Sequence, residues 1–474
     1  MKKIYISILL GAVMMSVLPA CKKGYFDLND NPNLVQDPPI NAMLSTVTHK
    51  TGVNSQSFGN LTGFYAQYLA SSSAANTLDT YDYTDQTSRW NLVYYTLADL
   101  YDLRQRATEL GSTEHLGVAD ILMAYNLGLV ADTWGSGPYS DAFTGEKLLI
   151  AYDSEEDLYK ASVELLEAGI EELKKTESTV ALGATEDVIH QGDKEAWIKT
   201  GYALYARFLN KISKKADYDP AAVLAALDQS YTSSADNAEM GVFDGINEWA
   251  NISQNNKELL LGGWLSSNLV DQLSGKTYGV FDPRVEQITE KTVNDDYVGT
   301  RNGQGNVGGA NTVHDECYIS EFSPWTSEDS PYVIVSYAEL KFIEAEAALN
   351  LPSPDRARAY AAYQEGIRAN MEMLEVSAAK QNTYINDPAV SVGASNLNLD
   401  LVFKEKYIAT YLNPEVWNDV RRHDYEYKDM KLPVSAQVDD FIRRVPYPLS
   451  ERSENGANVP EDLPVDTPLW WDQP

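Results

Sequence analysis

The chain has 474 residues, of which 69 are acidic and 37 are basic, so its formal charge is −32. This excess of carboxylates argues against a nucleic-acid partner, because binding to phosphates depends on a basic surface. It also argues against a chain that lies flat on anionic lipid. The only two cysteines, Cys21 and Cys317, exclude a disulfide framework and a thiolate metal site.

The N-terminus predicts export. Met1-Lys2-Lys3 is basic, residues 4–18 are apolar or small, and Leu18-Pro19-Ala20-Cys21 follows. The apolar stretch is too short to cross a bilayer and is typical of a signal peptide. Leu-x-Ala-Cys is similar to a bacterial lipobox, in which the cysteine receives a diacylglyceryl group. We therefore expect residues 1–20 to be a lipoprotein signal peptide and Cys21 to be the lipidation site. A plain signal peptide with a chance cysteine is the alternative.

The spacing of apolar residues predicts amphipathic helices along much of the chain. Ser154 is a suitable N-cap for one helix, with three acidic residues in its first turn. Asp193 can cap a second helix, and a shorter partner is expected over residues 220–231. Trp197 and Gly201 match part of the tetratricopeptide pattern. Short turns between these helices, with alanine and glycine at positions of close contact, indicate stacked helical hairpins.

A second helical group is expected later in the chain. We predict a helix over residues 332–350 and a partner that begins at Ser353-Pro354-Asp355, where a cap precedes proline. Further helices are expected over residues 399–411 and from Pro414 onward.

Long tracts rich in Gly, Asn, Pro or aromatic residues separate or follow the helices, at residues 235–330, 377–398 and 425–474. Loops of this length in a compact chain are usually functional or disordered. We expect these tracts to form a second layer over the helices, where a binding face can form.

Aromatic residues in these loops are the candidate ligand contacts, since sugars offer apolar C–H faces to rings and hydroxyl groups to polar side chains. The chain has 30 tyrosines and 9 tryptophans. Tyr81, Tyr83, Tyr297 and Trp325 lie near acids or amides in sequence, and Arg301 follows Tyr297 closely. We expect these four aromatic residues to bind the ligand, although a tryptophan more often packs in a core.

The sequence predicts no catalytic residues. Glu344 and Glu346 are two residues apart on a predicted helix and therefore point to different faces. We expect them to form ion pairs within the helical stack. Arg421 and Arg422 are expected to pair with such a glutamate or to stack on an aromatic ring. Neither a Gly-x-Ser-x-Gly elbow nor a His-Glu-x-x-His pair is present.

We also expect no cofactor and no metal. Two acidic clusters could hold Ca²⁺, namely Asp79, Asp82 and Asp85, and Asn294, Asp295 and Asp296. Neither has the oxygen spacing of a known calcium loop, so calcium is kept only as an alternative.

Five segments in order behind the lipobox carry a family likeness. The second reads Gly-Ser-Gly-Pro-Tyr-Ser-Asp-Ala at its end, and the last reads Arg-Arg-Val-Pro-Tyr-Pro. The segments are residues 21–33, residues 131–142, residues 336–347, Trp417 with Arg421 and Arg422, and residues 443–451. Together they resemble the SusD/RagB family of outer-membrane nutrient-binding lipoproteins from Bacteroidetes, in particular its SusD-like branch.

This resemblance implies a mostly α-helical fold, a scaffold of tetratricopeptide-like helical hairpins with a loop-rich ligand-facing portion. The SusD-like domain would span 21–474. Its helical repeats would lie at about 38–235 and 332–424, and its loop-rich insertions at about 236–331 and 377–398.

The resemblance also implies a partner and a location. The partner would be a SusC-like TonB-dependent transporter, and the lipid anchor would hold the protein on the exposed face of the outer membrane. The leading hypothesis is a non-enzymatic binder of nutrient oligosaccharides, and the same fold binding peptides is the first alternative. A lipid-anchored hydrolase and a helical-repeat assembly scaffold are the others.

Overall fold

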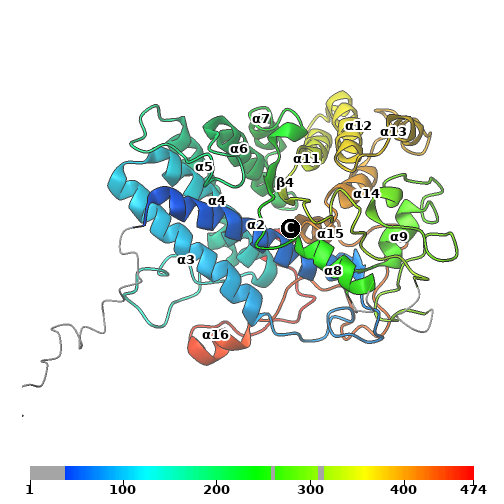
Figure 1. Cartoon of the computed structure of the whole chain (residues 1–474), viewed down its shortest axis with the longest axis horizontal. Helices are drawn as coiled ribbons and strands as arrows, with labels where there is room; N and C mark the ends of the chain where they lie inside the picture. The colour runs from blue at the N-terminus through cyan, green and yellow to red at the C-terminus, as the bar shows by residue number, and fades with distance from the viewer. Residues whose placement is uncertain (1–37, 258–261, 308–313) are drawn as a thin grey trace, which may run out of the picture. The chain divides into compact units, whose positions relative to one another are not determined.

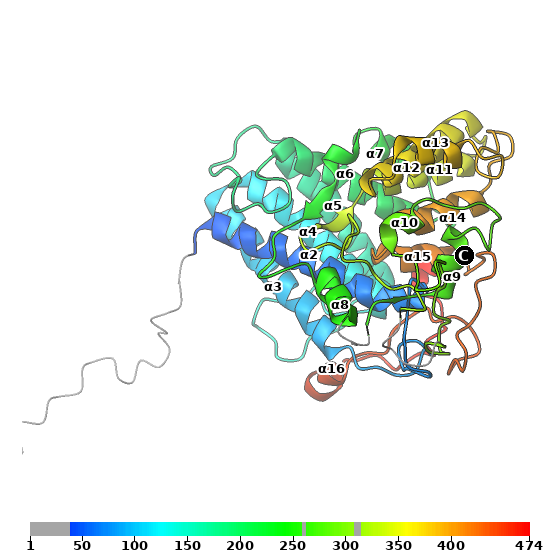
Figure 2. The same cartoon turned by 45° about the vertical axis from the view of Figure 1, so that its right-hand side comes forward.

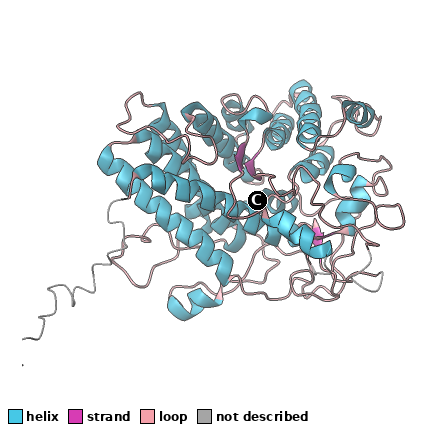
Figure 3. Ribbon diagram, viewed as in Figure 1, coloured by secondary structure: helices cyan, strands magenta, loops and turns pink. Residues whose placement is uncertain are grey.

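The computed structural model describes residues 38–257, 262–307 and 314–474, so the predicted signal peptide and Cys21 lie outside the described residues. Helices dominate the described part, and its strands are short (Figure 3). Residues 40–474 form one compact unit. The α-helices are α2 (Ile40–Tyr65), α3 (Thr87–Leu110), α4 (Thr113–Trp134), α5 (Glu155–Lys174), α6 (Lys194–Lys211), α7 (Pro220–Leu227), α8 (Glu248–Lys257), α9 (Ser267–Leu273), α10 (Val285–Ile288), α11 (Tyr337–Asn350), α12 (Arg356–Met373), α13 (Ala378–Ile385), α14 (Leu399–Ala409), α15 (Glu415–Arg422) and α16 (Leu449–Glu454).

Consecutive helices pack side by side, so the mostly helical fold with hairpins predicted from the sequence is confirmed. From α2 to α7 each helix contacts the next (Figures 1 and 2). A second group follows, in which α11 packs on α12 and also contacts α6, α7 and α14. The long α2, α3 and α4 were not predicted as individual helices.

Two predicted helix starts are confirmed by their caps. The Ser154 side chain accepts a hydrogen bond from the Asp157 N–H at 3.2 Å, and Asp193 accepts one from the Glu195 N–H at 2.9 Å. Each cap satisfies an N–H group that the first turn of a helix leaves unpaired.

Glycine permits the close approach of α4 and α5. A Cβ atom on Gly117 would lie 2.6 Å from the Gly169 carbonyl oxygen, and one on Gly169 would lie 2.7 Å from that of Gly117. Only hydrogen fits on both sides, so these two backbones pack in direct contact. This is the close-contact role expected for glycine in stacked hairpins.

Within the described ranges, α4 is also the one helix long and apolar enough to cross a membrane. In its most apolar window, 94% of the residues are buried inside the protein. The helix is therefore covered on nearly every side by its neighbours, as in the centre of a helical stack.

Two small antiparallel sheets link distant parts of the chain. β1 (Leu69–Ala70) pairs with β3 (Trp264–Leu265), with Leu69 opposite Leu265. β2 (Ala238–Met240) pairs with β4 (Tyr332–Val335), with Met240 opposite Tyr332.

Several predicted boundaries are wrong. Residues 332–335 form β4 rather than the start of a helix, because Val333, Ile334 and Val335 favour a strand and pair with β2. The following helix, α11, begins after Ser336, whose side chain accepts from the Glu339 N–H. The cap of α12 is Asp355, so Pro354 precedes the helix.

Some helices end earlier than predicted, and other helices lie within tracts that were predicted to be loops. α7 ends at Leu227 and α14 at Ala409, both short of the predicted ends. The tracts read as loops contain α8, α9, α10, α13 and α16.

Buried ion pairs join helices of the scaffold, and one of them links the two helical groups. Arg207 of α6 donates to Glu339 of α11 at 2.7 and 2.6 Å, and Arg422 of α15 donates to Glu346 of α11 at 2.5 and 3.0 Å. The Arg421 guanidinium lies 3.7 Å from the centre of the Trp417 ring. The prediction that Glu346, Arg421 and Arg422 serve the scaffold is confirmed, whereas the role of Arg207 was not predicted.

Candidate functional site

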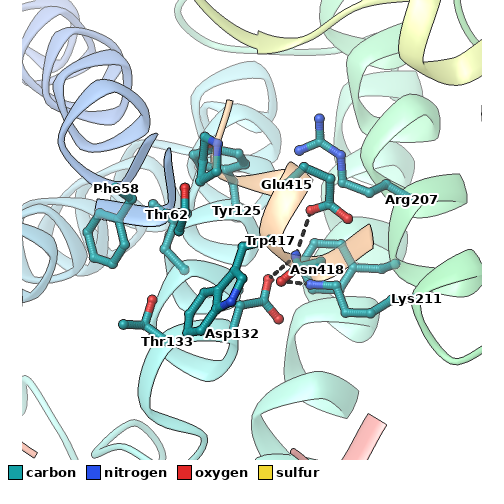
Figure 4. Close-up of a pocket in the computed structure, with 14 residues that line it drawn as sticks. Phe58, Thr62, Tyr125, Asp132, Thr133, Arg207, Lys211, Glu415, Trp417 and Asn418 are labelled. Atoms are coloured by element: carbon teal, nitrogen blue, oxygen red, sulfur yellow. Dashed lines mark hydrogen bonds and ion pairs between the residues drawn. The ribbon is translucent and has the colours of Figure 1, made fainter. Parts of the chain in front are cut away.

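A small internal cavity between α2, α4, α6 and α15 has a lining that superficially resembles an active site (Figure 4). Asp132 accepts hydrogen bonds from Lys211 Nζ at 2.5 Å and from Asn418 Nδ2 at 2.8 Å. The same Asn418 amide donates to Glu415 at 2.8 Å. Burial raises the pKa of Glu415, while the cations of Lys211 and Arg207 oppose this shift.

The size of this cavity excludes a sugar or peptide ligand. Its volume is about 20 Å³, which is room for about one water molecule. Asp132, Lys211, Glu415 and Asn418 around it are hydrogen-bonded to one another, as Figure 4 shows. We therefore interpret the cavity as part of the packing between helices.

A larger space, here called the polar groove, lies on the loop-rich side of the helical scaffold and has a volume of about 450 Å³. Four segments line it: Gln67 just after α2, α9 with the turn that follows it, residues 301–302, and residues 429–433. Pockets for small ligands usually have volumes of about 300–1,000 Å³. The groove is therefore large enough for a small ligand or the end of a longer one.

Hydrogen bonds fix the walls of the groove. The buried Asp79 carboxylate accepts from Asn302 Nδ2 at 2.6 Å and from the Gly303 N–H at 2.5 Å. Burial raises the pKa of Asp79, and these hydrogen bonds oppose the shift. Gln67 Nε2 donates to the Lys431 carbonyl at 2.7 Å. The groove thus has walls that are tied to α2 and to the loop at Asp79.

Gly303 joins two of these walls. Its φ is +77°, in the region that favours glycine, and a Cβ atom there would collide with the Val434 carbonyl oxygen. Beside it, the Val434 N–H donates to the Asn302 carbonyl at 2.9 Å. Residues 301–303 and the C-terminal tail therefore lie in direct backbone contact.

The lining of the groove is polar and carries charges of both signs. Asp271 of α9 pairs with Lys276 at 2.7 Å. Arg301, Lys431 and Asp429 are exposed and also face the space. Asn268 Nδ2 donates to the Tyr407 hydroxyl at 3.0 Å, which fixes this amide at the groove wall. Such a lining suits a ligand with many hydroxyl or charged groups.

Comparison with protein families identifies the chain. Residues 32–448 match the model of the SusD-like family that is described as starch-binding and associating with the outer membrane. The chain belongs to the SusD-like family. A search of curated protein sequences finds no match.

Solved structures agree with this SusD-like assignment at the level of the fold. A SusD/RagB family protein from Bacteroides thetaiotaomicron is 21% identical, with a TM-score of 0.75 over 92% of this chain and 99% of that one. A chitin-binding SusD homolog from Flavobacterium johnsoniae is 20% identical, with a TM-score of 0.73 over 91% and 98%. A SusD-like protein from Bacteroidetes is 20% identical, with a TM-score of 0.76 over 92% and 100%.

The four aromatic residues predicted to bind the ligand lie outside the lining of the polar groove. Tyr81 is 3% exposed and packs edge-on against Tyr65. Trp325 is 8% exposed and packs near Tyr411. For these two rings, burial leaves little surface open to a ligand.

The other two predicted aromatics are more accessible. Tyr83 is 48% exposed, and Tyr297 is half-buried with its ring centre 6.2 Å from that of Phe281. Ligand contact by all four residues stays a prediction, and the structure favours Tyr83 and Tyr297 over the buried pair.

The two acidic clusters considered as alternative calcium sites are engaged in other contacts. Asp79 holds the groove wall, Asp295 pairs with Lys291 at 2.8 Å, and Asp296 accepts from Thr292. Among the described residues, no three His, Cys, Asp or Glu side chains gather in a way that could hold a metal ion. A bound Ca²⁺ remains an untested alternative.

The polar groove was not predicted, because its residues come from four distant segments. One signal was present in the sequence: the glycine-rich run at residues 299–309 contains Arg301 and Asn302. Repeated glycine marks places where backbones approach closely, as Gly303 does against Val434.

Proposed function

We propose that this SusD-like protein is a cell-surface lipoprotein that binds nutrient oligosaccharides and delivers them to a SusC-like TonB-dependent transporter in the outer membrane. The observation that carries the proposal is the family match over residues 32–448. Two solved structures of similar fold are described as chitin-binding, which is consistent with a glycan as the ligand.

The polar groove supports binding of a hydroxyl-rich molecule. Ser267, Asn268 and Thr277 are among its lining residues, and hydroxyl and amide side chains of this kind hydrogen-bond to sugar hydroxyls. Neighbouring hydrogen bonds hold these walls in place, which reduces the ordering cost of binding.

The placement of the glutamates supports a binding role rather than hydrolysis. Glycoside hydrolysis commonly requires two carboxyl groups that flank one bond. In this chain Glu339 and Glu346 are buried in ion pairs with arginines, and Glu344 pairs with Lys341 and Arg358. These acids hold the scaffold together.

Titration calorimetry of the purified protein against a panel of soluble glycans and peptides tests the proposal. We expect at least one class of oligosaccharide to bind and none to be cleaved. Tight binding of peptides, with no binding of any glycan, would favour the alternative ligand class on the same fold. Release of shortened products from a glycan would instead identify a hydrolase.

Delivery to a transporter is tested by isolating the protein from outer membranes in mild detergent. We expect a TonB-dependent barrel to co-purify in a fixed ratio. Co-purification with several other proteins and no barrel would favour an assembly scaffold.

A further inference from the structure

Two cations of the polar groove have no side-chain partner among the residues that the structure describes. Within the described ranges, the Arg301 guanidinium and the Lys431 ammonium make no hydrogen bond, ion pair or ring contact. Acidic residues outnumber basic ones by 69 to 37 in this chain, so a cation left without a carboxylate is notable. Both side chains are exposed on the same groove lining.

The fold holds these two cations on adjoining segments. The Val434 N–H donates a hydrogen bond to the Asn302 carbonyl at 2.9 Å. This bond joins residues 429–434, which bear Lys431, to the loop that bears Arg301. The hydrogen bond from Gln67 Nε2 to the Lys431 carbonyl, at 2.7 Å, holds residues 429–434 from the other side. The positions of the two backbones are thus set by contacts that do not use the charged ends of the side chains.

The remaining charges of the groove leave it locally positive. Lys276 neutralises Asp271 at 2.7 Å. Asp429 is the other carboxylate among the described lining residues, so two acids face three cations there. In a protein with a net charge of −32, this local excess favours an anion at the groove.

The groove differs from an aromatic platform for neutral sugars. None of its lining residues is aromatic, in the part of the chain that the structure describes. Hydrogen bonds and charge must therefore supply most of the affinity there. An arginine offers a planar fork that matches a carboxylate or sulfate with two parallel hydrogen bonds.

We infer that the polar groove binds an anionic oligosaccharide, in which a uronate carboxylate or a sulfate ester meets Arg301 and Lys431 while the sugar hydroxyls meet Ser267 and Thr277. This inference rests on the proposed function and narrows its ligand class. An acidic peptide would offer the same charge but fewer hydroxyl groups for this lining.

Calorimetry with four matched probes tests the inference. The probes are a tri-galacturonate, its methyl ester, a sulfated trisaccharide and a neutral trisaccharide. We expect an anionic sugar to bind about ten-fold or more tightly than the ester and the neutral probe, because only it can form charge-assisted hydrogen bonds. The ratio between galacturonate and the sulfated sugar identifies which anion the groove prefers.

Variants locate the binding site. Arg301→Gln and Lys431→Gln are each expected to weaken binding of the preferred anionic sugar about ten-fold, and the double variant more strongly. Arg368→Gln is the matched control: it removes the same charge from a surface pair on α12 and should leave affinity unchanged. Thermal unfolding of each variant verifies that the exposed substitutions leave the fold intact.

Results that contradict the anionic-sugar inference can be told apart from results that contradict the proposed function. Equal binding of the neutral and anionic probes, or unchanged affinity in the double variant, would overturn the inference while a glycan-binding function stands. A tri-glutamate peptide that binds more tightly than the sugars and loses affinity in the same variants would overturn the sugar assignment. If neither the sugar probes nor any glycan of the wider panel bound, both the inference and the proposed function would be contradicted.

Discussion

Arg207 and Glu339 are buried in the core, where each is the counter-ion of the other. Both side chains are almost fully buried, and Arg207 also donates to the Ile334 carbonyl at 2.9 Å. Burial by itself would lower the pKa of Arg207, but Glu339 and Glu415 outweigh it and raise the pKa. Removing either partner therefore leaves a charge with too few contacts in a medium of low polarity.

We predict that Glu339→Gln destabilises the protein by about 3–5 kcal/mol, because Arg207 stays buried without its carboxylate. Urea unfolding measures the loss. The double variant Arg207→Met with Glu339→Leu should lose less than the single variant, since it removes both charges. A single variant as stable as the wild type would show that Arg207 finds another counter-ion.

His115 gives the stability a measurable pH dependence. Its ring nitrogens lie 2.8 Å from Ser112 Oγ and 2.7 Å from Asn41 Oδ1. Burial lowers the pKa of His115 to about 4, against about 6.5 in an unfolded chain. Between these values the unfolded chain binds a proton that the folded protein does not, so the contribution of His115 is present above pH 6.5 and declines as the pH falls toward 4.

His115→Gln is therefore expected to be destabilised most at pH 7 to 8. The difference in unfolding free energy between wild type and variant should shrink as the pH falls from about 6.5 to about 4. Unfolding curves at a series of pH values measure it. A difference that stays constant across this range would show that the folded protein does not lower the pKa of His115.

Between helices, close packing depends on the smallest residue. Gly117 and Gly169 each face the other's carbonyl oxygen, and a Cβ atom on Gly117 would also lie 2.6 Å from Leu173 Cγ. The backbones cannot move apart without disturbing α3 and α6, which pack on α4 and α5. Helix propensity thus favours alanine at position 117, whereas helix packing favours glycine.

For Gly117→Ala, propensity alone predicts a gain of about 0.5–1 kcal/mol, whereas the clash predicts a loss of about 1–3 kcal/mol. We expect the clash to dominate, so that the variant unfolds at lower urea. Gly245→Ala is the control, since a Cβ atom there has no neighbour within 4 Å, and its stability should change little. A stabilised Gly117→Ala would mean that α4 and α5 can separate at low cost.

For the molecule as a whole, the proposed lipid anchor would decide where an acidic protein with a formal charge of −32 is held. The family is described as associating with the outer membrane, and the function proposed above attributes that association to a lipid anchor predicted at Cys21. Stable attachment needs about two or more acyl chains, because a single chain binds membranes only weakly.

We predict that Cys21→Ser moves the protein from the outer-membrane fraction to the soluble fraction, because the acyl chains are lost. Immunoblots of separated fractions measure the shift, and mass spectrometry of the wild-type N-terminus should show an acylated cysteine. Cys317→Ser is the matched control, as this buried thiol has no part in anchoring. A membrane-bound Cys21→Ser protein with an unmodified wild-type N-terminus would contradict the anchor.

Helix caps and helix faces could be predicted from the sequence, because they depend only on residues that are close along the chain. The caps at Ser154 and Asp193 and the opposite faces of Glu344 and Glu346 follow from helix geometry alone. The strand at residues 332–335 was misread, because its pairing partner β2 lies about ninety residues earlier and long-range pairing can override local helix patterns.

The sequence by itself determined a helical scaffold and, through five ordered segments, membership of a family, while export stays a prediction. The tertiary structure alone decided which polar residues meet. Gln67, α9, Arg301 and Lys431 form one groove because backbone contacts bring four distant segments together, while Tyr81 and Trp325 are drawn into the core. Periodicity along a chain records which face of an element is buried, but it holds no information on which distant loops converge.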